Sequence, residues 1–471
     1  FTPRDPQVPI FDFGFSHARG NIYASMGTGK SSAGIAIFDG LRMLGEVKRC
    51  VVFGPKRVAR KTWPDEIKKF HESFGHLRIA AAIGTPDQRR AAVMSKPDIL
   101  AINYENAEWL AEGYGKDWPF DMVIADESTR LKGLRISLQT SSKGTEFIRG
   151  QGSVRAKALS KVAHRYVRHW LNLTGSPAPN GLADLWGQQW FVDAGRALGS
   201  SFDGFQERFF RSRPNADGYH QLYPLAHAEA EIKALMRAHC ITVNYGDYYP
   251  IDKPIETPVY VDLPPKARAI YDAMEKELFA ELAAGVPIQA FNAGGKVQKC
   301  LQIGNGTVYD SEREAHVVHD EKLQALESIV SEANGESILV RYTHIPDRER
   351  ILKVFPRLAR KFDDNPRTLQ AFRDGKIPQL FIHPASGGHG IDGMQDVCNN
   401  IAFFSQTWNL EEFEQVVERI GAVRQVSAGH FRSVYIHLIV AEDTVEEEMV
   451  HRIQTKASVQ DSLKLAMKRR M

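Results

Sequence analysis

The sequence predicts an α/β protein made of two parallel-sheet lobes with helical insertions. First, 471 residues are too many for one ordinary hydrophobic core. Second, short apolar runs alternate with helix-like segments, which is typical of a parallel sheet with crossover helices. Third, the intervening stretch is rich in aromatic and charged residues and carries a long helical pattern over 265–284. We therefore expect a first lobe over 1–255, with a helical insertion from about 187, a helical connector over 256–320 and a second lobe over 321–471.

Each predicted strand is a short apolar run that ends in polar or small residues. The first lobe has such runs at 50–53, 98–104, 122–125 and 171–174, and the second at 338–340, 380–383, 401–404 and 434–440. Ligands of open α/β sheets bind at the carboxyl ends of the strands. The polar tails are therefore expected to converge on one edge of each sheet.

The composition is that of a globular protein with nearly balanced charge. Apolar residues make up 43% of the chain and charged residues 25%, which argues against a disordered chain. The 60 basic and 57 acidic residues leave a net charge of +3, so the bulk charge does not indicate a nucleic-acid partner. Any nucleic-acid binding is expected from a local groove.

Cysteine usage and hydropathy favour a cytoplasmic protein without a membrane partner. Cys50, Cys240, Cys300 and Cys398 lie far apart, so neither a disulfide framework nor a zinc ribbon is expected. No apolar stretch has the length of a bilayer span, and the first residues lack the apolar core of a signal peptide. Because the chain starts at Phe1, we expect an initiator residue to precede it.

A glycine-rich loop joins an apolar run at 21–24 to a helix-like run that follows it. Residues 24–31 read Ala-Ser-Met-Gly-Thr-Gly-Lys-Ser. Gly27 and Gly29 let the backbone curl so that successive N–H groups and the helix N-terminus face an anion. Lys30 would reach the β- and γ-phosphates of a nucleotide, and Ser31 would offer its hydroxyl to Mg²⁺. The alternative is an ordinary glycine turn before an amphipathic helix.

Two carboxylates, Asp126 and Glu127, directly follow the apolar run at 122–125. In a fold with a phosphate loop, the end of a buried strand is where an Asp that coordinates Mg²⁺ is expected, with the next acid placed to orient or deprotonate the attacking water. Acidic pairs after strands are also common as solvated charges or helix caps. The pair indicates a catalytic site only in combination with the phosphate loop at Lys30.

These segments, in this order, resemble motifs I, II and III of superfamily 2 helicases, in particular the Swi/Snf-like branch found in phages and prophages. They are Ala-x-x-Gly-x-Gly-Lys-Ser, Asp-Glu-Ser-Thr and Leu-Thr-Gly-Ser-Pro-Ala-Pro-Asn. Further segments resemble other motifs of this branch: 3–7, 54–57 followed by Trp63 and Glu66, 102–105, 383–392, 407–409 and 415–419. The resemblance implies two RecA-like lobes.

The resemblance also implies ATP and Mg²⁺ between the lobes. The expected nucleotide-binding residues are Arg4, Gln7, Met26, Gly27, Thr28, Gly29, Lys30 and Ser31 in the first lobe, with Gly390 and Asp392 in the second; Gln7 matches the residue that reads the adenine. Ser31 and Asp126 would hold the metal. The expected catalytic residues are Lys30, Asp126, Glu127, Arg419 and Arg424, an arginine of the second lobe stabilising the charge on the γ-phosphoryl group.

Nucleic-acid contacts are expected on the strand-end loops that match family motifs. They are Lys56, Arg57, Asn103 and Tyr104 in the first lobe, and Arg341, Thr343, Ser386 and Trp408 in the second, where Trp408 would stack on a base or pack inside the lobe. Thr174, Gly175 and Ser176 would link the ATP state to the grip on nucleic acid. The basic stripe over 155–168 is either a solvated face or a DNA contact. His316, His319 and Asp320 are better explained as scattered polar residues of a connector than as a metal site.

One position departs from the family pattern. A second arginine falls three residues after the first in that pattern, and here the position is Ala422. We expect Arg419 to be indispensable and Arg424 to replace the missing arginine, with Gly421 supplying conformational freedom to the loop.

The resemblance implies an ATP-dependent translocase that moves on double-stranded DNA as its lobes close and reopen. The alternatives are a strand-separating or annealing helicase that acts on single-stranded DNA or RNA, and a nucleotide-gated DNA-binding scaffold with little turnover. Replication and recombination proteins are candidate partners. A nuclease is a further candidate, and it would supply the nuclease centre because nothing in this chain resembles one.

Overall fold

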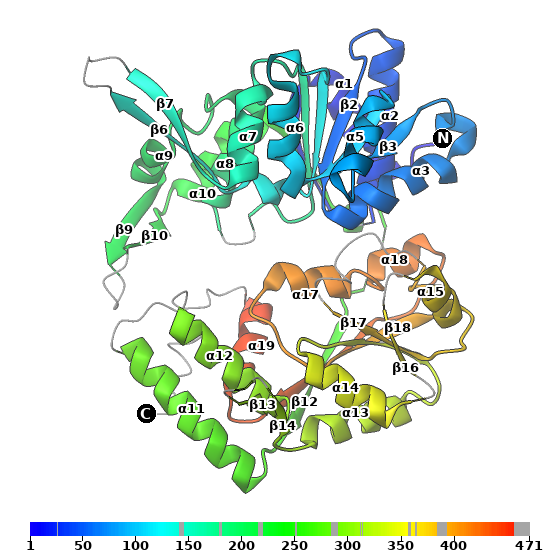
Figure 1. The fold of residues 1–471 in the computed structure, drawn as a ribbon, viewed down its shortest axis with the longest axis vertical. Helices are drawn as coiled ribbons and strands as arrows, with labels where there is room; N and C mark the ends of the chain where they lie inside the picture. The colour runs from blue at the N-terminus through cyan, green and yellow to red at the C-terminus, as the bar shows by residue number, and fades with distance from the viewer. Residues whose placement is uncertain are drawn as a thin grey trace. The chain divides into compact units, whose positions relative to one another are not determined.

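A computed structural model describes residues 1–25, 27–140, 146–178, 181–214, 220–249, 252–283, 291–310, 312, 314–356, 359–362, 365–383 and 393–455. The chain divides into two compact units, which are treated separately below. The first comprises Phe1–Arg213 and Leu222–Pro250, and the second Pro214–Gln221 and Ile251–Met471. Figure 1 shows the course of the chain through its helices and strands.

The first unit is built on a parallel sheet of seven strands in the order β11-β1-β8-β5-β2-β4-β3. Their bounds are β1 (Arg19–Ala24), β2 (Cys50–Gly54), β3 (Ile79–Ala81), β4 (Ile99–Asn103), β5 (Met122–Asp126), β8 (His169–Thr174) and β11 (Cys240–Val243). Every residue of β2, β4, β5 and β8 is buried, as expected for a parallel sheet covered on both faces. The four strands predicted for this lobe are therefore confirmed.

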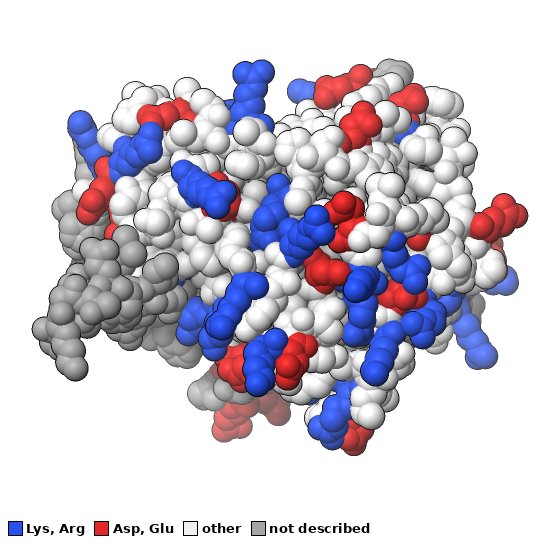
Figure 2. Space-filling model, turned by 90° about the horizontal axis from the view of Figure 1, so that it is seen from above, with Lys and Arg blue, Asp and Glu red and all other residues white. Residues whose placement is uncertain are grey.

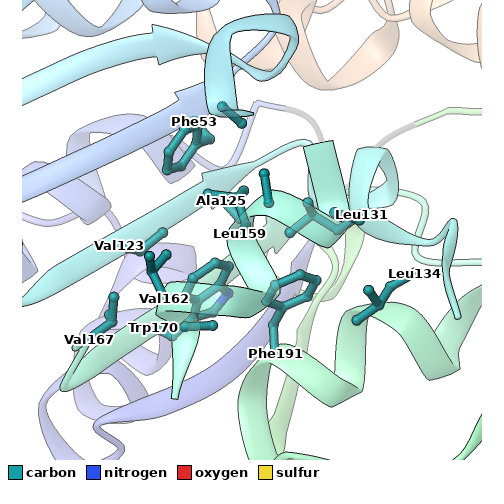
Figure 3. Packing of buried hydrophobic residues seen from close by; sticks show 14 of the residues in the cluster. Phe53, Val123, Ala125, Leu131, Leu134, Leu159, Val162, Val167, Trp170 and Phe191 are labelled. Atoms are coloured by element: carbon teal, nitrogen blue, oxygen red, sulfur yellow. The ribbon is translucent and has the colours of Figure 1, made fainter. Parts of the chain in front are cut away.

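Helices bury the two faces of this sheet in separate hydrophobic clusters. Val123 and Ala125 of β5 point into one cluster, and Met122 and Ile124 into the other, because successive strand residues face opposite sides. Figure 3 shows the first cluster, where Trp170 stacks on Phe191 with ring centroids 4.8 Å apart. The helices of the unit are α1 (Val8–Ser16), α2 (Lys30–Met43), α3 (Trp63–Lys69), α4 (His71–Phe74), α5 (Pro86–Met94), α6 (Ala107–Tyr114), α7 (Val154–Ala163), α8 (Asp184–Asp193), α9 (Phe202–Phe209) and α10 (Ala228–Met236).

The insertion expected from about residue 187 is only partly helical. It contains α8, α9 and α10, but also the two-stranded sheet of β9 (Phe210–Pro214) and β10 (His220–Pro224). Its last strand, β11, pairs in parallel with β1 at the edge of the main sheet. A second hairpin, β6 (Leu134–Thr140) with β7 (Glu146–Gly152), follows the Asp126 loop. β11 has only four residues, Cys-Ile-Thr-Val, which is too short a run for its pattern to indicate a strand.

The second unit holds a parallel sheet of six strands in the order β12-β19-β18-β15-β17-β16. Their bounds are β12 (Ile255–Val261), β15 (Ser337–Arg341), β16 (Ala359–Lys361), β17 (Gln379–Ile382), β18 (Cys398–Phe403) and β19 (Tyr435–Ala441). These positions confirm the four strands predicted for the second lobe. Its helices are α11 (Pro265–Ala283), α12 (Phe291–Gly304), α13 (Glu321–Glu332), α14 (Ile345–Val354), α15 (Pro366–Arg373), α17 (Leu410–Val417), α18 (Ala422–Ser427) and α19 (Val445–Thr455).

The segment 256–320, expected as a separate helical connector, starts with a strand of the second sheet. All seven residues of β12 pair with β19, from Ile255 opposite Tyr435 to Val261 opposite Ala441. Pro258 lies in this strand. Proline has no backbone N–H to donate, and an edge strand such as β12 tolerates it because only one side of the strand is paired. The segment continues through α11 and α12 to the hairpin of β13 (Thr307–Tyr309) and β14 (Ala315–Val317). Within the described part of the chain, no helix combines the length and the apolar character that a bilayer crossing requires.

Candidate nucleotide site and the loops connected to it

The glycine-rich loop leads from β1 into α2 and has the backbone that the sequence predicts. Gly27 and Gly29 both lie in the left-handed region, with φ of 80° and 79°. A Cβ on Gly29 would lie only 2.5 Å from Nε2 of Gln7, so glycine is required there by space as well as by conformation. The loop leads into the first turn of α2, and a glycine-rich loop before a helix N-terminus is a geometry that binds phosphate. Met26, also expected in this site, lies outside the described residues.

Arg4 and Gln7 fasten this loop from the N-terminal segment. Arg4 Nη2 donates to the carbonyl of Gly27 at 3.0 Å, and Gln7 Nε2 donates to the carbonyl of Gly29 at 3.0 Å and to Ser32 Oγ at 3.1 Å. Gln7 Oε1 accepts from the backbone N–H of Arg4, and Gln7 is buried. Two predicted nucleotide-binding residues thus contact the loop itself, while the adenine contact of Gln7 stays a prediction.

The polar side chains of the loop converge on the end of β1. Lys30 Nζ donates to the carbonyl of Ala24 at 2.7 Å and to that of Ser25 at 3.2 Å. Thr28 is buried, and its hydroxyl donates to the carbonyl of Ser25 at 2.8 Å. Ser31 is half-buried in the first turn of α2. Lys30 and Ser31 therefore both lie at the start of α2, next to the end of β1.

Asp126 is the last residue of β5 and is 5% exposed. Burial raises the pKa of its carboxyl, and the Trp63 hydrogen bond, the charge of Lys30 and the backbone N–H of Glu127 act in the opposite direction. Trp63 Nε1 donates to Asp126 Oδ2 at 2.9 Å, and the Tyr104 hydroxyl donates to the Asp126 carbonyl at 3.0 Å. Both ends of the residue are therefore fixed by aromatic donors from neighbouring strand-end loops.

Glu127 has a left-handed backbone, with φ of 57° and ψ of 57°. This conformation costs a non-glycine residue roughly 1–2 kcal/mol. Such strain is concentrated at functional sites, where the surrounding structure maintains it. Its half-buried side chain follows Asp126 directly, and its predicted role of orienting the attacking water stays a prediction.

The oxygen atoms at this edge fit Mg²⁺. Ser31 offers a hydroxyl and Asp126 a carboxylate that burial deprives of solvating water. Among the described residues no three His, Cys, Asp or Glu side chains group as a metal site. Magnesium does not need such a cage, because it is commonly held by one or two protein oxygens together with phosphates and water.

In the loops after β2 and β4, the residues predicted to contact nucleic acid differ in their exposure to solvent. Lys56 is exposed, and Arg57 is half-buried, with burial lowering its pKa. Asn103 is buried and donates through Nδ2 to Glu105 Oε2 at 2.7 Å. Tyr104 is 1% exposed and its hydroxyl donates to the Asp126 carbonyl, while its predicted contact with nucleic acid stays a prediction.

The segment expected to couple ATP to nucleic acid follows β8. Thr174 is fully buried, and its Oγ1 accepts from the backbone N–H of Ser176 at 3.2 Å. Gly175 is exposed and Ser176 half-buried. The sequence reasoning missed that α8 reaches both this segment and the loop after Asp126, because the glutamines of α8 resemble ordinary helix residues.

In the second unit, the residues expected to contact nucleic acid differ in their burial. Arg341 is 1% exposed and donates to the Gln406 carbonyl at 3.2 Å, to the Ser405 carbonyl and to the Glu412 carboxylate, while its predicted phosphate contact stays a prediction. Thr343 is half-buried, with its N–H donating to Ser405 Oγ at 3.2 Å. Trp408 packs against the cluster of α11, α12 and α19. Ser386, Gly390 and Asp392 lie outside the described residues.

The two candidate arginines lie on either side of a helix break. Arg419 follows α17 and is 4% exposed, whereas Arg424 is half-buried within α18. Ala422 is the first residue of α18, and Gly421 precedes it with φ of −55°. Any residue adopts that φ, so the expected conformational freedom of Gly421 is not used. A Cβ there would lie 3.2 Å from the Val417 carbonyl oxygen, a tight contact that glycine avoids.

The surface charge follows the balance of the composition. On the face drawn in Figure 2, Lys and Arg side chains are interspersed with Asp and Glu. Several of the first unit's cations are paired, as Arg42 is with Asp98 at 3.2 Å and Arg168 with Glu46 at 2.7 Å. The face in this view therefore carries no continuous basic surface.

A phosphate loop, a buried acid after β5 and the ordered strand-end motifs are carried on two parallel α/β sheets, the arrangement that the resemblance to Swi/Snf-like helicases of superfamily 2 implies. No protein-family model matches the chain. The putative protein p41 of Acyrthosiphon pisum secondary endosymbiont phage 1 is 44% identical over 477 residues, covering 100% of this chain and 99% of that protein. The chain belongs to the family of this phage protein.

More distant similarity extends to cellular proteins. The putative ATP-dependent helicase/translocase YwqA of Bacillus subtilis is 21% identical over 93% of this chain, which spans only 46% of the length of YwqA. Among solved structures, the Sulfolobus solfataricus SWI2/SNF2 ATPase core in complex with dsDNA is 21% identical, with 97% of this chain and 91% of that chain covered and a TM-score of 0.42.

Proposed function

We propose that this chain is an ATP-dependent motor that moves along double-stranded DNA. The observation that carries the proposal is the double hydrogen bonding of Asp126. Trp63 and Tyr104 belong to the two segments that resemble nucleic-acid-contacting motifs, and each donates to the residue expected to serve ATP hydrolysis. A phosphate backbone bound to those loops would therefore act on the catalytic acid through one hydrogen bond on each side.

Nucleotide binding is assigned to the loop before α2. Its N–H groups and those of the helix N-terminus would donate hydrogen bonds to the β-phosphate. Lys30, which donates to the carbonyls of Ala24 and Ser25 in this structure, would turn to the β- and γ-phosphates when a nucleotide binds. Ser31 and Asp126 would hold Mg²⁺, which would neutralise charge on the phosphate oxygens. Arg4 and Gln7 keep the loop in its curled form.

Hydrolysis needs a hydrogen-bond acceptor that orients the attacking water, and it needs positive charge next to the γ-phosphoryl group. Glu127, held in a strained backbone next to Asp126, orients the water. Arg419 of the second unit supplies positive charge for the γ-phosphoryl group, and Arg424 supplements it where the family pattern is broken at Ala422. Because the arginines belong to a different unit from Lys30, turnover is coupled to relative movement of the units.

The preference for duplex DNA rests on the resemblance to the Swi/Snf-like branch. The solved Sulfolobus core was captured with dsDNA, and YwqA is named a helicase/translocase. Contacts from residues such as Lys56 would reach phosphates, so binding is expected to be independent of sequence and sensitive to salt.

The deciding experiment measures ATP hydrolysis with blunt duplex DNA, single-stranded DNA and RNA, each over a salt series. We expect the largest stimulation with duplex DNA, falling as salt rises. Lys30→Ala should abolish the stimulated rate, whereas Lys48→Ala, which removes an exposed lysine of the same unit, should not. A rate indifferent to every nucleic acid would contradict the motor.

Two further assays separate the alternatives. Displacement of a triplex-forming strand without unwinding of a forked duplex is the expected result for a translocase, and the reverse result would favour a strand-separating helicase. Single-turnover hydrolysis at saturating DNA tests the scaffold, which would bind ATP and release it intact.

A further inference from the structure

We propose that Gln188 is a positioning residue that couples the loop after Asp126 to the segment after β8, so that nucleic-acid binding accelerates ATP hydrolysis through it. The inference rests on the proposed function. Gln188 lies in the middle of α8, is fully buried and matches none of the motifs considered above.

The amide of Gln188 joins two chain segments that have no sequence proximity. Its Oε1 accepts from Ser128 Oγ at 2.8 Å, one residue after Glu127. Its Nε2 donates to the Pro177 carbonyl at 2.6 Å, one residue after Ser176, and to the Asp184 carbonyl at 3.0 Å. One side chain thus contacts the loop expected to cleave ATP and the segment expected to pass on the ATP state.

Both polar atoms of this amide are hydrogen-bonded. The oxygen has an acceptor role, and both N–H groups have carbonyl partners. The backbone carbonyl of Gln188 is also held, by Asn172 Nδ2 at 2.9 Å, from two residues before Thr174. Since an unmade buried hydrogen bond is costly, displacement of either loop must move the other or break the bridge.

Other contacts of α8 place it against the same loop. A Cβ on Gly187 would lie 2.9 Å from the carbonyls of Leu131 and Lys132, so glycine permits the close approach. Lys132 Nζ also pairs with Asp184 Oδ2 at 3.3 Å. The helix is therefore packed on the loop, and Gln188 is its contact with both segments.

The next residue provides a matched control. Gln189 is equally buried, but its Oε1 accepts from Asn21 Nδ2 at 2.7 Å and its Nε2 donates to Asp193 Oδ2 at 2.7 Å. These amide partners lie on β1 and at the end of α8, in neither of the two segments. Gln188→Met and Gln189→Met each replace a buried amide by an apolar side chain of similar length, so both remove buried hydrogen bonds.

The test compares DNA-free and DNA-saturated kcat, together with KM for ATP, in the wild-type chain and both variants. Gln188→Met should lower the ratio of stimulated to basal kcat by about three- to tenfold, with KM changed less than about twofold. Gln189→Met should keep the wild-type ratio. Gln188→Met should also reduce the difference in duplex affinity between a non-hydrolysable ATP analogue and ADP, which a purely structural role would not alter.

The outcomes distinguish the two proposals. A wild-type chain without DNA-stimulated turnover overturns the proposed function and this inference with it. A stimulated wild-type chain whose ratio survives in Gln188→Met, or falls equally in Gln189→Met, overturns the inference alone. If Gln188→Met does not fold, Ser128→Ala removes the other end of the bridge, and an unchanged ratio in that variant overturns the inference as well.

Discussion

The indole nitrogen of Trp63 lies 2.9 Å from Oδ2 of Asp126, and both side chains are buried. Trp63 opens α3, and its ring reaches Gly34 of α2, where a Cβ would come within 2.8 Å of Cη2. The tryptophan therefore packs between the helix that follows the phosphate loop and the strand that ends in Asp126. Since Trp63 belongs to the segment that begins at Gly54 and includes Lys56, a candidate DNA-contacting loop is joined directly to the candidate metal ligand.

Replacing Trp63 should weaken catalysis more than folding. Trp63→Phe keeps most of the apolar ring and removes the donor to Asp126, so the carboxylate loses the bond that orients it. Substitution of a residue that hydrogen-bonds a metal ligand commonly lowers activity or metal affinity by about 10- to 100-fold. For Trp63→Phe we therefore expect kcat to fall about tenfold and the half-saturating Mg²⁺ concentration to rise.

The matched control for Trp63 is Trp118→Phe, because Trp118 Nε1 also donates a buried hydrogen bond, at 2.9 Å to the Phe120 carbonyl, but away from the loop edge. Steady-state kinetics over a magnesium series checks both variants. Equal kinetic losses in the two would contradict a specific role for Trp63.

The arginines around Ala422 should divide the role that the family pattern gives to two residues. Arg419→Ala should lower DNA-stimulated turnover about a thousandfold, which is the lower range for loss of an arginine finger. Arg424→Ala should lower it at least about tenfold if Arg424 replaces the missing arginine. Arg367→Ala, on the exposed side of α15, serves as the control. Unchanged turnover in Arg424→Ala would show that this substitute does not operate.

The second unit should depend on a buried ion pair. Lys322 Nζ lies 2.6 Å from Glu446 Oε1, both side chains are at most 1% exposed, and burial lowers the pKa of Lys322. Lys322→Met leaves a buried carboxylate without its cation and should destabilise the unit by about 3–5 kcal/mol. The double variant Lys322→Met/Glu446→Gln should recover at least about 1 kcal/mol of this loss. Urea unfolding measures both, and a double variant less stable than the single one would contradict the pairing.

Acid should weaken the second unit through His319. Its Nε2 lies 2.8 Å from the Ile303 carbonyl and its Nδ1 accepts from the Glu321 N–H at 3.3 Å, so the neutral ring uses both nitrogens. Burial lowers the pKa of His319 from 6.5 to about 4. Between those values the unfolded chain binds the extra proton, so stability is complete above pH 6.5 and decreases as the pH falls toward 4.

The expected loss at pH 5 is at most about 2 kcal/mol relative to pH 7. Urea unfolding at both pH values measures it, and His319→Gln should reduce the difference between them. His71→Gln, at an exposed histidine, should not. The same pH difference in His319→Gln as in the wild-type chain would contradict the assignment.

Much of the fold was readable because its signals are local. The apolar runs that became β2, β5, β15 and β18 specify buried strands through their own hydrophobicity, and Gly27 and Gly29 specify the loop through their own backbone freedom. The sequence analysis did not predict β11 and β12, because edge strands are stabilised by the neighbour they pair with and need no long apolar run of their own.

The sequence by itself determined the phosphate loop, the acid after β5 and the order of the motifs, since each is a property of a short segment. Only the tertiary structure decided that Tyr104 and Arg341 are enclosed, that Trp63 holds Asp126 and that Gln188 joins Ser128 to Pro177. Burial and hydrogen-bond partners depend on which distant segments pack together, and the type of a residue does not carry that information.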